Sequence, residues 1–329
     1  MISNIERRPV EERITVVIPT LGRAVLCKSL MALAVGTRWP ASVIVVDQGW
    51  NPAIAKWTDE LTSRGMCVRH VPSAQQGRAA GLNRGIERVE TAYVAITDDD
   101  CLAHPDWIQR IIEHLLERPT AIVTGRAEAT GPEPTVVVNT STAFGVQRRP
   151  HFLYDSLCGG NMGMSVATSE KIGPFDEDPR LRTAEDIEYA YRALRVGIPI
   201  VHAPDVVVHH LGWRGTRERF QQYEDYARSH GGFYGKYLRA GDSFIAVRAS
   251  VHLFRALRRW ARGVATGNGE LSAHGRAYAL GLLPGMVAGW RGGVAPKPSG
   301  PRRREDVALQ VTDAGTVRGE GSSADSGRG

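Results

Sequence analysis

Three adjacent carboxylates, Asp98, Asp99 and Asp100, follow a short apolar segment and could bind a divalent cation. Adjacent carboxylates repel one another unless a cation neutralises them. Their oxygens suit Mg²⁺ and similar hard cations, and such a cation can bridge a diphosphate and stabilise it as a leaving group. The alternative is an Asp-rich turn that caps the next helix. We favour the metal site, because His104 and Pro105 give the later helix its own start.

A second acidic site, Glu185 and Asp186, comes just after Thr183. An exposed carboxylate near a reacting carbon can act as the base that deprotonates a hydroxyl. The alternative is structural, because Thr183-x-x-Asp186 also fits a capping box at the start of a helix. Spacing alone leaves both interpretations open.

Two further segments contain residues that suit ligand binding. Gly160 and Asn161 belong to the small-residue stretch GGNMG, which could let an acceptor approach the backbone or could serve tight strand packing. His209 and His210 end a Val-rich segment. A histidine beside carboxylates can ligate a transition metal such as Mn²⁺, whereas a histidine pair at a strand end is more often structural.

The remaining candidate residues share a position at or after the ends of predicted strands. They are Pro19, Thr20 and Arg23 at the first strand, Asp47 at the second, and Arg78 and Asn83 after the third. Each alone has an ordinary explanation as a polar loop or turn residue. In a parallel sheet, however, ligands bind beyond the carboxyl ends of the strands. We therefore expect these side chains to meet the carboxylate triplet at one sheet edge.

The hydrophobic pattern predicts the elements that would hold these residues. Segments 14–18, 42–46, 66–71, 92–97 and 121–124 read as buried strands, and segments 24–36, 52–64, 77–88 and 105–117 have helical spacing. Asn51 followed by Pro52 is typical of a helix N-cap with proline in the first turn. Residues 183–197 read as a later helix, and residues 198–210 as one or two strands. Strands alternating with helices of this length predict an α/β fold with a mainly parallel sheet.

The composition changes towards the C-terminus. Residues 244–264 contain five arginines and no acidic residue, and Phe244, Val247, Val251 and Phe254 recur at helical spacing. A basic amphipathic helix is typical of a membrane-surface element, although the stripe could instead pack on the rest of the protein. Residues 278–290 form a second apolar stretch, too short to span a bilayer and interrupted by Pro284. The segment from 296 onwards is rich in Gly, Ser, Pro and charge, which predicts disorder.

The bulk properties allow several classes of partner. The chain has 329 residues, 42% of them hydrophobic, and a net charge of +6, which fits a phosphate-bearing ligand, an anionic membrane or nucleic acid. Four widely spaced cysteines form no CxxC pair. The polar N-terminus resembles no secretory signal, and no apolar run is long enough to span a membrane. We therefore expect a cytoplasmic protein, peripheral at the inner face of the cell membrane.

Together these segments resemble the family-2 inverting glycosyltransferases, which have the GT-A fold. The resemblance covers residues 14 to 210 and rests on six segments in the family's order: VVIPTLGR, VIVVDQG, GRAAGLNRGI, ITDDDCLAHPDWI, GGNMGMS and AEDIEYAYRAL. Two features depart from the family's pattern. Gly81-Leu82-Asn83 replaces the usual Ala-Arg-Asn, and the QxxRW motif of processive members is absent from the matching stretch at 189–193.

The resemblance implies a role for each candidate residue. Asp47 would bond a uracil or thymine ring, and Asp98 and Asp99 would lie near the ribose and diphosphate. Asp100 would hold Mn²⁺ or Mg²⁺, with Asp98 and His210 or His209 completing the metal site. Asp186 would be the catalytic base, with Glu185 beside it. Pro19, Thr20, Arg23, Arg78 and Asn83 would line the nucleotide-sugar site, and Gly160 and Asn161 the acceptor side.

These expectations define an architecture and a reaction. Residues 10–240 would form a GT-A, Rossmann-like domain, residues 241–295 a basic amphipathic helical extension, and residues 296–329 a disordered tail. The protein would transfer a hexose or deoxyhexose from a UDP- or dTDP-sugar to a cell-envelope glycan or lipid-linked saccharide. It would contact an anionic membrane surface and no nucleic acid. The alternatives are a sugar nucleotidyltransferase, whose Gly-rich first loop is missing, and a non-catalytic module that binds nucleotide sugars or membranes.

Overall fold

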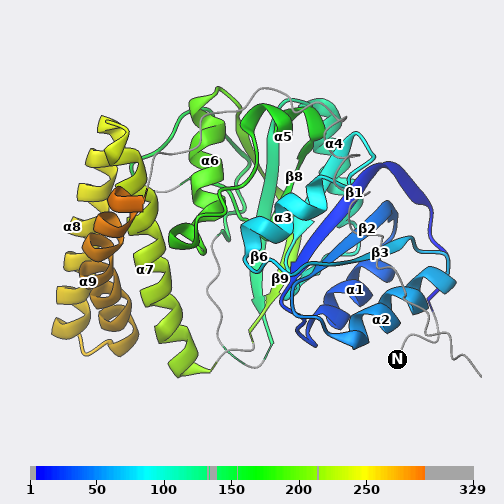
Figure 1. The fold of residues 1–329 in the computed structure, drawn as a ribbon, viewed down its shortest axis with the longest axis horizontal. Coiled ribbons are helices and arrows are strands. Elements are labelled where there is room, and N and C mark those ends of the chain that lie inside the picture. The colour runs from blue at the N-terminus through cyan, green and yellow to red at the C-terminus, as the bar shows by residue number, and fades with distance from the viewer. Residues whose placement is uncertain (1–4, 132, 134–138, 154, 213–214, 293–329) are drawn as a thin grey trace, which may run out of the picture.

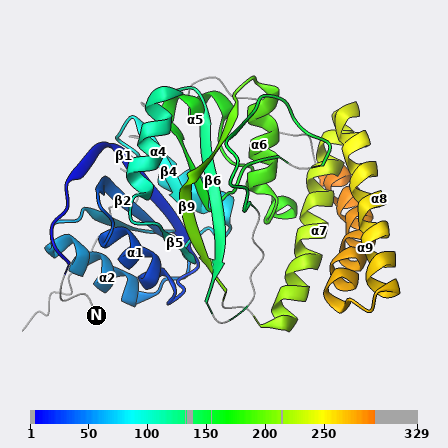
Figure 2. The same cartoon turned by 180° about the vertical axis from the view of Figure 1, so that it is seen from behind.

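The alternation of strands and helices produces a mixed sheet covered by helices on both faces (Figures 1 and 2). The computed structural model describes residues 5–131, 133, 139–153, 155–212 and 215–292. Its nine-stranded sheet has the order β3-β2-β1-β4-β8-β6-β9-β5, and β7 pairs with β9. The neighbours β3, β2, β1 and β4 are all parallel, whereas β8 is antiparallel to both β4 and β6.

The predicted strands and helices are present, although β1 and β6 extend beyond their predicted bounds, and β5 and α5 were not among the predicted segments. The strands are β1 (Val10–Thr20), β2 (Trp39–Asp47), β3 (Val68–Pro72), β4 (Tyr93–Thr97), β5 (Cys101–Ala103), β6 (Ile122–Thr130), β7 (Gly145–Gln147), β8 (Asn161–Ser165) and β9 (Ile200–Leu211). The helices are α1 (Leu26–Ala34), α2 (Pro52–Ser63), α3 (Arg78–Ile86), α4 (Trp107–Glu117), α5 (Val166–Ile172), α6 (Glu185–Arg195), α7 (Thr216–Arg239), α8 (Ser243–Ala265) and α9 (Gly269–Gly292), with a short 3-10 turn, η1 (Pro179–Leu181). Asn51 caps α2 as predicted, since its side chain accepts a hydrogen bond from the backbone of Ala53.

Two hydrophobic cores hold the helices on the sheet. Helices α1, α2 and α4 cover one face, where Val16 and Ile18 of β1 point, and α3, α5 and α6 cover the other, where Val17 points. Successive side chains of a strand point to opposite faces, so a strand buried on both faces must be apolar throughout. This explains why the strands read as continuous Val and Ile runs. It also leaves the strand ends, and not the faces, available for polar chemistry.

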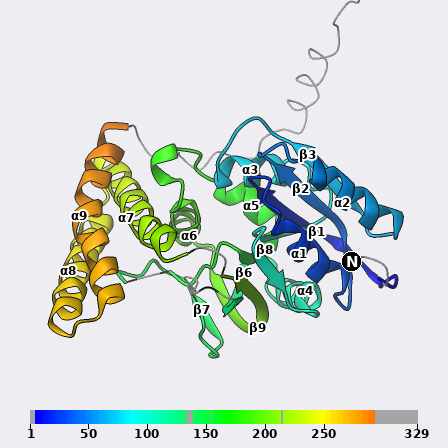
Figure 3. The same ribbon diagram turned by 90° about the horizontal axis from the view of Figure 1, so that it is seen from below.

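The C-terminal helices form a separate bundle beside the sheet (Figure 3). Helix α7 packs against α8 and α9 around a core that includes Phe233, Ile245 and Leu282. The bundle therefore begins at the start of α7, well before residue 241, where we expected the extension to start. Helix α9 continues through Pro284. The expected disordered tail, 296–329, lies outside the described residues.

The structure also changes the expected surroundings of the α8 arginines. Arg248 is buried, and its Nη1 atom donates to Asp155 Oδ2 over 2.5 Å. The segment contains no acidic residue of its own, but the loop before β8 supplies a counter-charge that local sequence does not reveal. Among the described helices, none is long and apolar enough to cross a bilayer.

Candidate active site

The parallel strands β1, β2 and β4 end at the same sheet edge and bring the predicted acidic and nucleotide-side residues together. At the end of β1, Thr20 Oγ1 donates to Asp99 Oδ2 over 2.6 Å. Arg23 Nη1 lies 3.0 Å from Asp99 Oδ1 and 3.6 Å from Asp100 Oδ2. Burial raises the pKa of Asp99 to about 6, against the lowering effect of Arg23 and Thr20. The loop after β1 is thus tied directly to the carboxylate triplet.

Asp47 ends β2 and is almost completely enclosed. Its two carboxylate oxygens accept hydrogen bonds from the backbone N–H groups of Gly49 (2.9 Å) and Asn51 (3.1 Å). His70 Nε2 lies 3.1 Å from Asp47 Oδ2. Asp47 therefore stabilises the turn after β2. Its contact with the uracil or thymine ring of a nucleotide stays a prediction. The contact with His70 was not predicted, because His70 is 23 residues away in the sequence and reaches Asp47 only through the pairing of β3 with β2.

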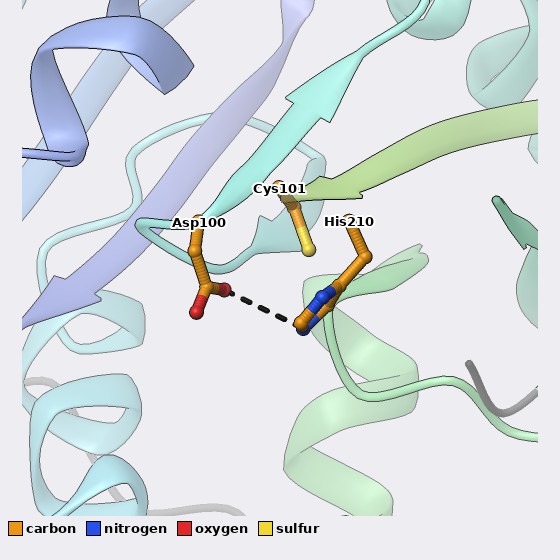
Figure 4. A group of neighbouring side chains, drawn as sticks. All are labelled: Asp100, Cys101 and His210. Atoms are coloured by element: carbon orange, nitrogen blue, oxygen red, sulfur yellow. Dashed lines mark ion pairs between the residues drawn. The ribbon is translucent and has the colours of Figure 1, made fainter. Parts of the chain in front are cut away.

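Two of the predicted metal ligands, Asp100 and His210, lie close together where β5 pairs with β9 (Figure 4). Asp100 Oδ1 lies 3.7 Å from His210 Nε2, and Asp100, Cys101 and His210 place one ligand atom each within 4.8 Å of one another. Burial raises the pKa of the Cys101 thiol well above its ordinary value, which keeps it protonated. A carboxylate and an imidazole fit Mn²⁺ or Mg²⁺ chemistry better than a neutral thiol does.

The neighbouring histidine lies elsewhere. His209 Nδ1 is 3.6 Å from Glu128 Oε2, and His209 lines a polar pocket of about 360 Å³ with His104, Asp106 and Arg110. Successive residues of a strand point to opposite faces, so only one of the two histidines can face Asp100. Of the two histidines, His210 is therefore the one that faces Asp100, and its role as a metal ligand stays a prediction.

Arg78 begins α3 and connects two acidic groups of the site. Its Nε atom donates to Asp98 Oδ1 over 2.7 Å, and its Nη1 atom donates to Glu185 Oε1 over 3.0 Å. Two buried atoms of this cluster, Arg78 Nη2 and Glu185 Oε2, have no hydrogen-bond partner among the described residues. Because an unpaired buried polar atom is costly, this arrangement suits a site that a ligand completes.

The acidic pair at α6 is not used as a helix cap. Helix α6 has Ala184 as its N-cap residue and no side-chain cap bond, and Thr183 Oγ1 instead donates to the Asp225 backbone oxygen over 3.3 Å. The capping-box alternative is therefore wrong. Asp186 is partly exposed, whereas Glu185 is buried and bound to Arg78.

The environment of the pair favours protonation of its carboxyl groups. Burial is the main cause that raises the pKa of Glu185, to about 8, and Arg78 partly opposes it. Burial likewise raises the pKa of Asp186. A carboxylate with a raised pKa is a stronger base than an ordinary one, which suits a group that must accept a proton near neutral pH.

Two adjacent glycines make room for the carboxylates. A β-carbon on Gly159 would lie 2.5 Å from Asp186 Oδ2, and one on Gly160 would lie 2.7 Å from Asp98 Oδ2. Any larger residue at either position would displace a carboxylate. The segment before β8 thus allows Asp98 and Asp186 to lie close to adjacent glycines. The structure shows this packing role for Gly160, and its contact with an acceptor stays a prediction.

Two predicted contact residues have structural roles. Asn161 is fully buried, and its amide bonds Trp107 Nε1 and the backbone oxygens of Arg126 and Val206 at 2.8–2.9 Å. It cannot contact an acceptor in this arrangement, so that prediction is corrected: Asn161 joins β8 to its neighbours. Asn83 is also buried. Its Nδ2 atom donates to the backbone oxygen of Phe175, and its Oδ1 atom accepts from the backbone N–H of the same residue.

The loops after β1 and β2 are packed closely against α3. A β-carbon on Gly81 would lie 2.8 Å from Pro19 Cβ and 3.2 Å from Gln48 Oε1. This contact explains the departure from Ala at position 81. Gln48, which sequence reasoning missed, donates from Nε2 to the backbone oxygens of Gln75 and Gly77. Pro19 therefore serves the packing of the site, and its contact with a nucleotide stays a prediction.

Comparison with known proteins identifies the family. Residues 15–173 match the family described as Glycosyl transferase family 2. Over these residues, from β1 to the end of α5, the chain is similar to this family. Glycosyltransferase AglE of Haloferax volcanii is 24% identical over 200 residues, covering 59% of this chain and 65% of that protein. A pre-mycofactocin glycosyltransferase of Mycobacterium tuberculosis is 26% identical over 212 residues, covering 61% of this chain and 43% of that protein. The chain thus spans less than two thirds of the length of these relatives.

Solved structures show the same fold. A mannosyltransferase, PcManGT from Pyrobaculum calidifontis, in complex with GDP-Man and Mn²⁺, aligns with a TM-score of 0.55 and 17% identity over 86% of each chain. Residues 1–349 of S. aureus TarS in complex with UDP align with a TM-score of 0.51 and 11% identity, covering 81% of this chain and 90% of that one. The expected GT-A fold is confirmed.

Proposed function

We propose that this protein transfers a sugar from a nucleoside diphosphate sugar to an acceptor hydroxyl, with inversion at the anomeric carbon. The observation that carries the proposal is the position of Asp186. Its Oδ1 atom accepts the Ile187 backbone N–H, and its Oδ2 atom lies against Gly159, while Asp98 lies against the adjacent Gly160. This position would hold a base beside the acidic sheet edge, where the family binds its donor.

The donor side is supported by the residues at the strand ends. Thr20 and Arg23 hold Asp99, and Arg78 holds Asp98 while keeping Nη2 without a partner among the described residues. A guanidinium N–H in that state suits a phosphate oxygen. Asp47 would accept the ring N–H of uracil or thymine, so UDP- and dTDP-sugars are favoured. Guanine also presents N–H donors to a carboxylate, which makes a GDP-sugar the alternative that a donor panel must include.

A divalent cation, Mn²⁺ or Mg²⁺, fits the residues at the β5–β9 pairing. Asp100 and His210 would hold it. Asp98, the other predicted ligand, accepts a hydrogen bond from Arg78 and is not part of this group. When bound, the cation would neutralise charge on the departing diphosphate. Arg23 is 3.6 Å from Asp100 and would share this neutralisation from the protein side.

The chemical step is a single displacement. The acceptor hydroxyl gives its proton to an Asp186 oxygen while its oxygen forms a bond to the anomeric carbon. The bond from that carbon to the diphosphate oxygen breaks, and the nucleoside diphosphate leaves with the electron pair. One displacement inverts the configuration. Glu185 would not take the proton but would hold Arg78, because it is buried and bonded to that side chain.

The acceptor we propose is a cell-envelope glycan or a lipid-linked saccharide. The similarity to the family supports sugar transfer over nucleotidyl transfer. The position of the Asp186 Oδ2 atom against Gly159 supports an enzyme over a module that only binds. The test is a thermal-shift panel of UDP-, dTDP- and GDP-sugars with and without Mn²⁺. We expect one donor class to raise the melting temperature only when the metal is present. Failure of every nucleotide sugar to stabilise the protein would contradict the proposal.

A further inference from the structure

The C-terminal bundle leaves an apolar stripe uncovered on each of its two outer helices. On α8 the exposed apolar residues are Val247 (49% exposed), Phe254 (66%), Leu257 (48%) and Val264 (65%). On α9 they are Leu280, Leu283, Val287 and Trp290, each at least 50% exposed. The spacings are three and seven residues on α8 and three and four residues on α9, which places each set along one side of its helix. These eight residues are called the α8–α9 face below.

Both stripes lie on the side turned away from α7. Helix α9 directs Gly281, Gly285 and Gly289 at the backbone and Cβ atoms of α7, and the stripe lies on the other side. Helix α8 directs His252 towards Tyr234 of α7, where its Nδ1 atom lies 3.0 Å from the phenol oxygen. The two helices also pack on each other, since Gly275 of α9 fits against the backbone of α8 at Trp260. The α8–α9 face is therefore the outer surface of a rigid pair of helices.

This apolar surface is bordered by positive charge. Residues 243–292 contain seven arginines and a single carboxylate, Glu270, which lies at the start of α9. Arg248 is buried against Asp155 and does not contribute to the surface. The exposed members are Arg255, Arg258, Arg262, Arg276 and Arg291. Arg258 follows Phe254 by one helical turn, and Arg276 precedes Leu280 by one turn, so charge and apolar groups share the same surface.

We propose that the α8–α9 face binds an anionic lipid surface, with its apolar side chains in the acyl boundary and its arginines on the headgroups. A second copy of the chain is the competing occupant, but it would bring an equally basic face and place like charges opposite one another. The helices would lie in the plane of the interface, because neither is long and apolar enough to span it. This proposal does not depend on the identity of the donor or on the catalytic step.

The test is co-sedimentation of the full chain with vesicles of phosphatidylcholine alone or mixed with phosphatidylglycerol. We expect binding to the anionic vesicles at low salt, weak binding to the neutral ones, and release at high salt. Replacing Arg258 and Arg276 by Gln should weaken binding about five-fold for each arginine. Phe254→Gln with Leu283→Gln should abolish it. The matched control is Leu116→Gln, which changes an exposed leucine of α4 (47% exposed) and should leave binding unchanged.

Three results would overturn the proposal: no binding of the full chain to anionic vesicles at low salt, equal binding of the Phe254 and Leu283 variant, or a dimer that the same variant disrupts. Donor hydrolysis by each variant should equal that of the wild-type protein. This readout distinguishes loss of lipid binding from loss of the catalytic function proposed above.

Discussion

Arg78 donates from Nη1 to Glu185 Oε1 over 3.0 Å and so joins the first residue of α3 to the first residue of α6. The same guanidinium holds Asp98 at the end of β4. One side chain therefore fixes the distance between the donor-side carboxylates and the pair that contains the proposed base. We expect the geometry of the site to depend on Arg78 more than on any exposed residue around it.

Arg78→Gln should lower both stability and donor affinity. Asp98 and Glu185 would lose their guanidinium partner while Glu185 remains buried, which costs about 1–3 kcal/mol of unfolding free energy. Arg78→Lys should restore only part of the donor affinity, because an ammonium cannot bond two carboxylates as a planar fork does. Denaturant titration and calorimetric donor titration would measure both effects. The control is Arg84→Gln, which removes an exposed arginine of the same helix; equal losses in the two variants would argue against the bridging role.

Asp186→Asn should remove turnover and leave the fold intact. Loss of a general base typically costs 10²–10⁴-fold, so we expect kcat to fall by about that factor while donor affinity stays within a few-fold. The melting temperature should hardly change, because the amide oxygen of Asn can still accept the Ile187 backbone N–H that Asp186 Oδ1 accepts at the start of α6. Normal turnover with a reduced melting temperature would instead identify Asp186 as a structural residue. Glu170→Gln, in α5, is a suitable control for carboxylate removal.

His210 and His209 form a matched pair for testing the metal site. His210 lies 3.7 Å from Asp100, whereas His209 contacts Glu128 in the polar pocket. His210→Ala should raise the Kd for Mn²⁺ by more than about 10-fold, because a ligand should matter at least as much as the surrounding groups that orient it. His209→Ala should leave the Kd unchanged. Electron paramagnetic resonance of free Mn²⁺ measures the affinity without an activity assay; equal effects of the two substitutions would contradict the assigned ligand.

The bundle should lose stability in acid because three half-buried histidines lie within it. Burial lowers the pKa of His252 to about 3 and of His274 to about 4, and lowers that of His230 well below its ordinary value. Arg259 also lowers the pKa of His274. A depressed pKa means that the unfolded chain binds the proton first, so this stability is present above about pH 6.5 and is lost as pH falls below it.

The free energy of unfolding should fall by at most about 1.4 kcal/mol per histidine for each pH unit. Glu185 has the opposite sign, since its raised pKa favours folding at lower pH. The bundle contribution is therefore best measured as the difference between the wild-type protein and His252→Gln in denaturant titrations at several pH values. The control is His151→Gln, which replaces an exposed histidine in a loop. The same pH slope in all three proteins would show that the bundle histidines do not control the acid response.

The sheet and the acidic edge could be predicted from local sequence, because both depend on short-range patterns. A parallel strand buried on both faces must be apolar, and its carboxyl end must carry the polar loop. Thr20 and Asp99 therefore met as expected, although they are 79 residues apart. The choice between His209 and His210 needed only the register of β5 on β9, which the sequence does not contain.

Other features depend on long-range partners and were not predictable. Thr183 and Asp186 fit a capping box, but Thr183 bonds the backbone of α7 instead. Asn161 reads as a polar residue beside an acceptor site, yet Trp107 and two strand backbones enclose it. The α8 arginines read as uncompensated, and Asp155 reaches one of them from 93 residues away. In each case the deciding contact is made by a residue outside the motif.

The most direct test of the central claim is release of nucleoside diphosphate from a nucleotide sugar, followed for the full chain with Mn²⁺ and with EDTA. The account predicts slow, Mn²⁺-dependent release from one donor class, with water taking the place of the acceptor. It also predicts that Asp100→Ala abolishes the release and that Asp186→Asn reduces it while still binding the donor. Release that persists in EDTA, or that is unchanged in both variants, would contradict a metal-assisted transfer at this sheet edge.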